Sequence, residues 1–171
     1  MDSDKGRVLT CNLSNVYFVT EARSRWLRSS EICEILRNHK RFNLTVDPPH
    51  KPPGGSFFLF NKNEVRNFRK DGHCWRKKKD GITVREAHEK LKIGKELVLD
   101  CYYAHGEDNK NFRRRIYWLH DEKLENIVLV HYRDLSEARE QCRGTWCFSR
   151  YRKLESLFPF LSSKSDGNAK Y

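Results

Sequence analysis

The stretch from Arg69 to Lys79 reads Arg-Lys-Asp-Gly-His-Cys-Trp-Arg-Lys-Lys-Lys and is a dense run of positive charge. Seven of its eleven residues are lysine, arginine or histidine, and only Asp71 opposes them. Neighbouring exposed cations repel one another by ~1 kcal/mol or less per pair, so their accumulation predicts a polyanionic partner. Nucleic acid is the commonest such partner inside cells. A solvated turn or a nuclear-import signal is the alternative.

The overall composition indicates a globular chain with a small core and a strong positive charge. The 171 residues are enough for one domain of ordinary size. Hydrophobic residues make up only 37% of the chain, but aromatic residues reach 12%, so we expect a core built from large side chains. The net charge of +11 favours DNA or RNA as the partner. Because the sequence has neither a basic amphipathic helix nor an apolar run of ~20 residues, we expect no membrane partner.

The first third of the chain is expected to hold two helices. Residues 1–19 are weakly patterned and predict a poorly ordered leader with at most one short strand. A short helix is expected over residues 21–27, and Ser29 or Ser30 is expected to cap a second helix that has an acidic residue in its first turn. The Pro- and Gly-rich residues 47–55 can form neither a helix nor a central strand, and they predict a stiff loop.

The segments on either side of the basic stretch are short. Residues 56–60 predict a buried strand, and residues 63–69 predict a short helix. Residues 75–79 predict a strand, whose alternate side chains face opposite ways. We expect Trp75 to be a packing anchor and not a ring on which bases stack. One face would then carry Trp75, Lys77 and Lys79, and the other Arg76 and Lys78.

Residues 83–93 have the clearest helical pattern in the sequence. Thr83 and Glu86 match a capping box, and Gly94 matches a C-terminal stop. Apolar and histidine residues recur at helical spacing between them, at Val84, Ala87, His88 and Leu91.

Three strands are expected after this segment, over residues 97–104, 112–119 and 126–132. Polar loops separate them, which predicts an antiparallel meander. The middle strand would turn Arg113, Arg115 and Tyr117 one way and Phe112, Ile116 and Trp118 the other, and Arg114 does not fit the pattern. A sheet with one cationic and one apolar face suits contact with an anion, and a solvated arginine face is the alternative.

The sequence therefore predicts an α+β fold, with a small antiparallel sheet of about four strands packed against three to four short helices. The expected domain organisation is a weakly ordered leader over residues 1–20, a folded domain over residues 21–135 and a marginally ordered C-terminal extension over residues 136–171.

Long ungapped motifs follow one another through the expected domain. Together they closely resemble the N-terminal DNA-binding domain of the calmodulin-binding transcription activators (the CAMTA family). The resemblance implies a nuclear domain that binds double-stranded DNA at CGCG-type boxes and regulates transcription. The motifs include Arg25-Trp-Leu-Arg28, Glu31-Ile-Cys-Glu-Ile-Leu-Arg37, Trp75-Arg-Lys-Lys-Lys-Asp-Gly81, Cys101-Tyr-Tyr-Ala-His-Gly-Glu-Asp-Asn109 and Val130-His-Tyr132.

The match to this family has gaps and departures. We see no immunoglobulin-like module, ankyrin repeat or calmodulin-binding region in the chain, so the family's calcium response is not carried over. Ser29-Ser30 stands where the family usually has proline, and Cys74 stands where it usually has asparagine. Arg113 replaces the usual glutamine and is expected to strengthen non-specific affinity.

A looser similarity concerns the order of motifs around Trp75. Asp71-Gly-His-Cys-Trp-Arg-Lys77, followed by Cys101-Tyr-Tyr103, is similar to the layout of WRKY and glial-cells-missing domains, which insert a strand into the DNA major groove. By analogy, residues 75–79 would be the reading strand.

The chemistry of guanine suits the side chains of this strand. Arginine and lysine can donate to both O6 and N7, and each good contact discriminates by ~1–3 kcal/mol. Because alternate residues face opposite ways, either Lys77 and Lys79 or Arg76 and Lys78 are expected to read bases. Flanking cations would hold phosphates and set the register. The expected DNA-binding set is Arg69, Lys70, His73, Arg76, Lys77, Lys78, Lys79, Arg114 and Arg115.

Two other functions compete with DNA binding. An RNA-binding module would use the same charge, but it would need exposed aromatic platforms, and the aromatic residues here lie mostly on expected apolar faces. A nuclease could use Glu107, Asp108 and His105. Such a polar loop is more typical of a solvated turn, so we expect no enzyme activity.

One cysteine and three histidines could in principle form a metal site. Cys101, His105, His120 and His131 fall near the ends of neighbouring expected strands, and the WRKY analogy suggests zinc. The sequence has no Cys-x2-Cys or His-x3-His pair, so we predict no metal and no cofactor. The six cysteines show no pairing framework and are expected to be mostly free thiols in a reducing compartment.

Overall fold

The computed structural model describes residues 13–136, in which a five-stranded antiparallel sheet is combined with two α-helices. The strands lie side by side in the order β1-β5-β4-β3-β2. The α+β class is confirmed, with five strands where about four were expected and two α-helices where three to four were expected. The elements are α1 Leu13–Ser24, α2 Ser29–Arg37, a 3₁₀ turn His39–Arg41, β1 Phe57–Asn61, β2 Ala87–Ile93, β3 Glu96–His105, β4 Phe112–Leu119 and β5 Ile127–Asp134.

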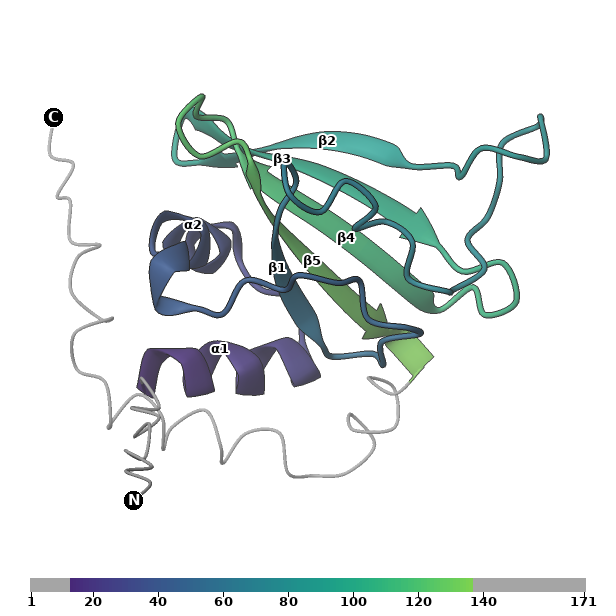
Figure 1. Ribbon diagram of the computed structural model, residues 1–171, viewed down its shortest axis with the longest axis horizontal. Coiled ribbons are helices and arrows are strands. Elements are labelled where there is room, and N and C mark those ends of the chain that lie inside the picture. The colour runs from purple at the N-terminus through teal and green to yellow at the C-terminus, as the bar shows by residue number, and fades with distance from the viewer. Residues whose placement is uncertain (1–12, 137–171) are drawn as a thin grey trace, which may run out of the picture. The chain divides into compact units, whose positions relative to one another are not determined.

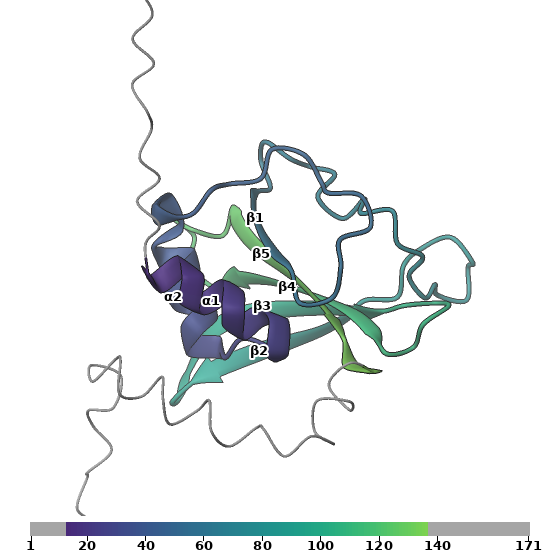
Figure 2. The same cartoon turned by 90° about the horizontal axis from the view of Figure 1, so that it is seen from below.

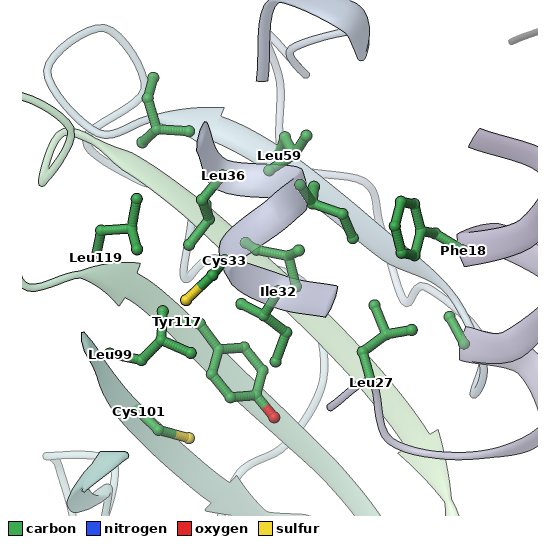
Figure 3. Packing of buried hydrophobic residues seen from close by; sticks show 14 residues of the cluster. Phe18, Leu27, Ile32, Cys33, Leu36, Leu59, Leu99, Cys101, Tyr117 and Leu119 are labelled. Carbon is green, nitrogen blue, oxygen red and sulfur yellow. The ribbon is translucent and has the colours of Figure 1, made fainter. Parts of the chain in front are cut away.

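One face of the sheet, here called the helix face, packs against α1 and α2 (Figure 1, Figure 2). In α2, Ile32, Ile35 and Leu36 are at most 1% exposed, because helical spacing places all three on the side that meets the sheet. They belong to one cluster with sheet residues such as Leu99 and Tyr117 (Figure 3). These three side chains therefore form the apolar face of α2.

The opposite face, here called the loop face, is covered by the long connection between β1 and β2 (Figure 2). Val65, Phe68 and Trp75 from this connection are buried against the strands. The helix expected over residues 63–69 is wrong, because the segment consists of turns. The backbone oxygen of Asn61 accepts the amides of Glu64 and Val65, which closes a turn at the end of β1.

The helix expected over residues 83–93 is also wrong, because most of this segment is strand β2. Ala87–Ile93 pairs antiparallel with β3, from Ala87 opposite Tyr103 to Ile93 opposite Glu96. Gly94, expected to stop a helix, instead begins a two-residue hairpin loop with a φ of +63°. Pairing with a strand that is already part of the sheet outweighs the local helical pattern.

The N-terminal segment differs from the expected leader. Residues 13–24 form α1, so the short strand considered before residue 20 is wrong in this part, and the helix expected over 21–27 ends at Ser24. Residues 1–12 and 137–171, which include most of the expected C-terminal extension, lie outside the described residues. No helix between residues 13 and 136 is long and apolar enough to cross a membrane.

A tight corner joins α1 to α2. The backbone N–H of Arg28 donates to Oε2 of Glu31 at 2.7 Å, and the guanidinium of Arg25 bonds both carboxylate oxygens of Glu31, at 2.7 and 2.8 Å. Ser29 and Ser30 are the first two residues of α2, and the N-cap is Arg28. The expectation that one of the two serines caps this helix is therefore wrong. Glu31 lies in the first helical turn, as predicted, and there it closes the corner.

Candidate nucleic-acid interface

The basic stretch forms a projecting hairpin, here called the basic arm, which comprises residues 76–85. Its two sides are joined by hydrogen bonds from the Lys78 amide to Thr83 O and from the Arg85 amide to Arg76 O, both 2.8 Å. Figure 1 shows the arm extending beyond the start of β2. The strand expected over residues 75–79 is replaced by an extended segment that pairs through single bridges, Trp75 with Gly106 and Lys77 with Val84.

The tip of the arm is a turn held by Asp80. Its Oδ1 atom accepts the backbone amides of Ile82 and Thr83, both at 2.9 Å. Gly81 has a φ of +67°, which favours glycine. Hydrogen bonds from the Thr83 side chain and from these amides lower the pKa of Asp80 to about 2, so it is ionised at neutral pH. The tip therefore has a defined shape although it is exposed.

We expect Asp80→Ala to loosen this turn, because the two amides lose their acceptor. Amide hydrogen exchange of Ile82 and Thr83 should accelerate, as measured by NMR, while the core strands stay protected. Asp121→Ala is the matched control, because Asp121 accepts the Lys123 amide in a separate turn at 3.0 Å. Unchanged exchange at Ile82 and Thr83 would contradict the role given to Asp80.

The lysines of the arm are accessible to a partner. Lys77, Lys78 and Lys79 are all exposed. Among residues 13–136, no carboxylate lies within ion-pairing distance of any of the three. The structure therefore brings together three expected site residues as exposed lysines on one projecting element.

The base of the arm is fixed by Trp75 and Asp71. Trp75 is only 4% exposed, which confirms the expectation that it is a packing anchor. Its indole Nε1 donates to Oδ1 of Asp71 at 2.9 Å, while Oδ2 of Asp71 accepts from Arg114 at 2.7 Å and from the Tyr132 hydroxyl at 2.9 Å. Burial and the nearby Asp71 carboxylate raise the pKa of Tyr132, so its hydroxyl stays protonated as a donor.

Arg114 lies inside the protein and not at the surface. Its side chain is 1% exposed, and its guanidinium also donates to Glu86 at 3.0 Å and lies 4.7 Å from the centre of the Trp75 ring. Arg69 joins the same group through Glu86, at 3.1 Å, although its own side chain is 41% exposed. This geometry explains why Arg114 does not fit the strand pattern, and it gives Arg114 a positioning role in place of the expected phosphate contact.

The remaining expected site residues are dispersed. His73 is half-buried, contacts Pro52 O through Nε2 at 2.8 Å and packs against Phe112, so it supports the base of the arm. Lys70 is exposed on the connection that leads to the arm. Arg115 lies on the helix face, with its guanidinium 4.2 Å from the centre of the Trp26 ring. Lys70, His73 and Arg115 therefore lie outside the basic arm.

The metal and nuclease candidates have other contacts. His120 bonds Asp100 at 3.0 Å, and the Nε2 of buried His131 bonds Ala22 O at 2.9 Å. Burial raises the pKa of the Cys101 thiol to about 12, so it stays protonated. Within residues 13–136 no group of three His, Cys, Asp or Glu side chains is placed to hold a metal ion. Glu107 and Asp108 are exposed in the loop between β3 and β4.

Sequence reasoning missed the acidic residues on which the arm depends. From the sequence, Asp71 is interpreted only as the single charge that opposes the basic run, and Glu86 only as part of a helix cap. Their partners lie far away in the chain, at Arg114 and Tyr132, so spacing could not reveal them. The one available signal was the single arginine on an otherwise apolar face of β4, because a buried guanidinium requires a carboxylate.

These features define an α+β domain with a cationic hairpin whose base is anchored by a buried charge network. A family model described as the CG-1 domain matches residues 21–135, and the chain belongs to this family. It is 59% identical over 127 residues to "Calmodulin-binding transcription activator 2" of Arabidopsis thaliana, a match that covers 74% of this chain and 12% of the relative.

Other relatives extend the comparison. The chain is 59% identical over 158 residues to "Calmodulin-binding transcription activator 3" of Arabidopsis thaliana, covering 88% of this chain and 15% of that protein. It is 42% identical over 139 residues to the human "Calmodulin-binding transcription activator 2", covering 78% of this chain and 11% of that protein. The chain thus spans a small part of its relatives, and no solved structure matches it. The resemblance to the calmodulin-binding transcription activators is confirmed.

Proposed function

We propose that this domain binds double-stranded DNA at CGCG-type boxes and regulates transcription in the nucleus. The observation that carries the proposal is the basic arm, because three exposed lysines project on a hairpin of defined shape and no carboxylate of residues 13–136 forms an ion pair with them. The relatives are named as transcription activators, which accords with a DNA-binding role. Their names also state calmodulin binding, which we do not assign to this chain. Transcription activators are not enzymes, and we propose no catalytic activity.

The arm would enter the major groove with its tip foremost. That groove is ~12 Å wide and admits a two-stranded ribbon. Lys77 and Lys78 point to opposite sides of the hairpin, so one can meet a guanine edge while the other meets a phosphate. The buried network at Asp71 would hold the hairpin at a fixed angle, and exposed Lys70 would add a phosphate contact beside it.

We expect replacement of Lys77, Lys78 and Lys79 by alanine to abolish specific binding without unfolding the domain. Losing two good guanine contacts costs about 2 kcal/mol or more, which is about a 30-fold loss of affinity. The measurement is a mobility-shift titration with a CGCG duplex and a scrambled duplex. The matched control replaces Lys90, Lys92 and Lys95, three exposed lysines in and beside β2, and should bind the box nearly as well as the parent.

The same titration tests the competing RNA function. Single-stranded RNA of matched length should compete poorly with the CGCG duplex, because the aromatic residues of the loop face pack against one another and against the core. If RNA competed as well as the duplex, or if the arm variant kept full affinity for the box, the proposed function would fail.

A further inference from the structure

Four arginines and one histidine stand in one line across the sheet and the arm. Within the sheet, His105 of β3 is directly opposite Arg113 of β4, and Arg113 is directly opposite Arg133 of β5. The line continues into the arm, where the Arg76 amide donates to His105 O and the Arg85 amide donates to Arg76 O, both at 2.8 Å. Because Trp75 pairs with Gly106 and Lys77 with Val84, Arg76 is directly opposite both His105 and Arg85.

All members of this line point to the helix face. His105 and Arg113 alternate along their strands with residues that pack on the loop face, and Arg76 follows Trp75, which is buried on the loop face. Arg85 is exposed, Arg76, His105 and Arg113 are half-buried, and Arg133 is 4% exposed. The first four residues of the line, from Arg85 of the arm to Arg113 of β4, are therefore at least partly exposed to solvent, and Arg133 is not.

This arrangement is unfavourable for the isolated domain. Like charges directly opposite one another on neighbouring strands are destabilising. Burial, and after it the positive charges of Arg113, Arg76 and Arg85, lower the pKa of His105, so it is mostly neutral at pH 7. The buried Nε of Arg113 has no hydrogen-bond partner in the described part of the chain.

Three other arginines of the described domain are paired with carboxylates. Arg25 pairs with Glu21 and Glu31, and Arg69 and Arg114 share Glu86. In contrast, Arg76, Arg85 and Arg113 have no carboxylate within ion-pairing distance in the described residues 13–136. An internal carboxylate is therefore not what brings these side chains together.

We propose that Arg85, Arg76, His105 and Arg113, here called the cationic row, bind consecutive phosphates of the duplex whose bases the arm contacts. This inference rests on the proposed function. At about 4.8 Å between strands, the row spans roughly 14 Å. The guanidinium fork matches phosphate geometry, and Arg76 belongs to both the row and the arm, so one duplex can meet both surfaces. Phosphate contacts would fix the orientation of the duplex relative to the arm without reading sequence.

The test measures the salt dependence of duplex binding for Arg85→Gln and Arg113→Gln. Each variant should make the slope of log affinity against log salt shallower by about 0.9, the contribution of one phosphate contact. Affinity at 0.1 M salt should fall about five- to tenfold, equally for the CGCG duplex and a scrambled duplex. Arg113→Lys should restore most of the slope, and Arg37→Gln, an exposed arginine at the far end of α2, should leave it unchanged.

The salt slopes and the two duplexes distinguish failure of the cationic row from failure of the proposed function. Unchanged slopes in both variants, with the parent protein still binding the CGCG duplex, would overturn the row and leave the arm proposal intact. Loss confined to the CGCG duplex would also overturn it, because that pattern belongs to base readout. A parent protein that binds no duplex would defeat the proposed function itself. Should Arg113→Gln fail to fold, exposed Arg85→Gln still carries the test.

Discussion

Asp71→Ala is expected to lower the free energy of unfolding by about 3–5 kcal/mol, the usual cost of removing one partner from a buried ion pair. Asp71 and Arg114 are both 1% exposed at the side chain, and 2.7 Å separates their bonded atoms. Without the carboxylate, Arg114 keeps Glu86 and a backbone oxygen, but the Trp75 indole and the Tyr132 hydroxyl lose their acceptor. The substitution therefore removes hydrogen bonds both from Trp75, which anchors the arm, and from Tyr132 in the core.

Urea unfolding monitored by circular dichroism measures this effect. Asp108→Ala, at an exposed loop position, removes the same charge and should change stability by less than about 0.5 kcal/mol. The double variant Asp71→Leu with Arg114→Met should regain part of the loss, because apolar residues can replace a buried pair. A loss below about 1 kcal/mol in Asp71→Ala would show that the network is not needed for folding.

Acid is expected to lower the stability of the fold through the buried His131. Burial lowers the pKa of His131 to about 4, while the unfolded chain should have an ordinary value near 6.5. The folded state thus binds fewer protons between these values, so stability falls as pH drops from about 6.5 toward 4. A difference of about 2.5 pKa units corresponds to about 3 kcal/mol. Above about pH 7 this contribution is constant.

Free energies of unfolding at pH 7, 5.5 and 4.5 check this prediction. His131→Gln removes the titrating group and should flatten the profile relative to the parent, although its stability at pH 7 will be lower because it disturbs the contact with Trp26. His50→Gln, at an exposed position, serves as the control and should keep the parent profile. Parallel profiles for the parent and His131→Gln would rule out His131 as the acid-sensitive group.

Strands with strong local patterns could be predicted from the sequence. The strand expected over residues 112–119 is β4 with the same bounds, and the meander of the last three strands is confirmed. The apolar run at residues 56–60 corresponds closely to β1. In these segments, the conformation favoured by side-chain alternation and flanking turns is the same as the one required by the tertiary structure.

Segments that depend on distant partners could not be predicted. Residues 87–93 fit a helix locally, and only pairing with β3 makes them a strand. The role of Asp71 depends on Arg114 and Tyr132, which lie 43 and 61 residues away in sequence. The basic arm was found from its charge alone, but its alignment with His105 and Arg113 follows from strand register, which the sequence does not state.

The hydrogen bonds that hold the arm at both its base and its tip have a kinetic consequence. A segment that must fold when it meets its target loses conformational entropy at that moment, whereas the base and tip of this hairpin are already hydrogen-bonded in the free domain. Its capture by a target should therefore be a single encounter-limited step, with an association rate that rises linearly with concentration and slows as ionic strength increases.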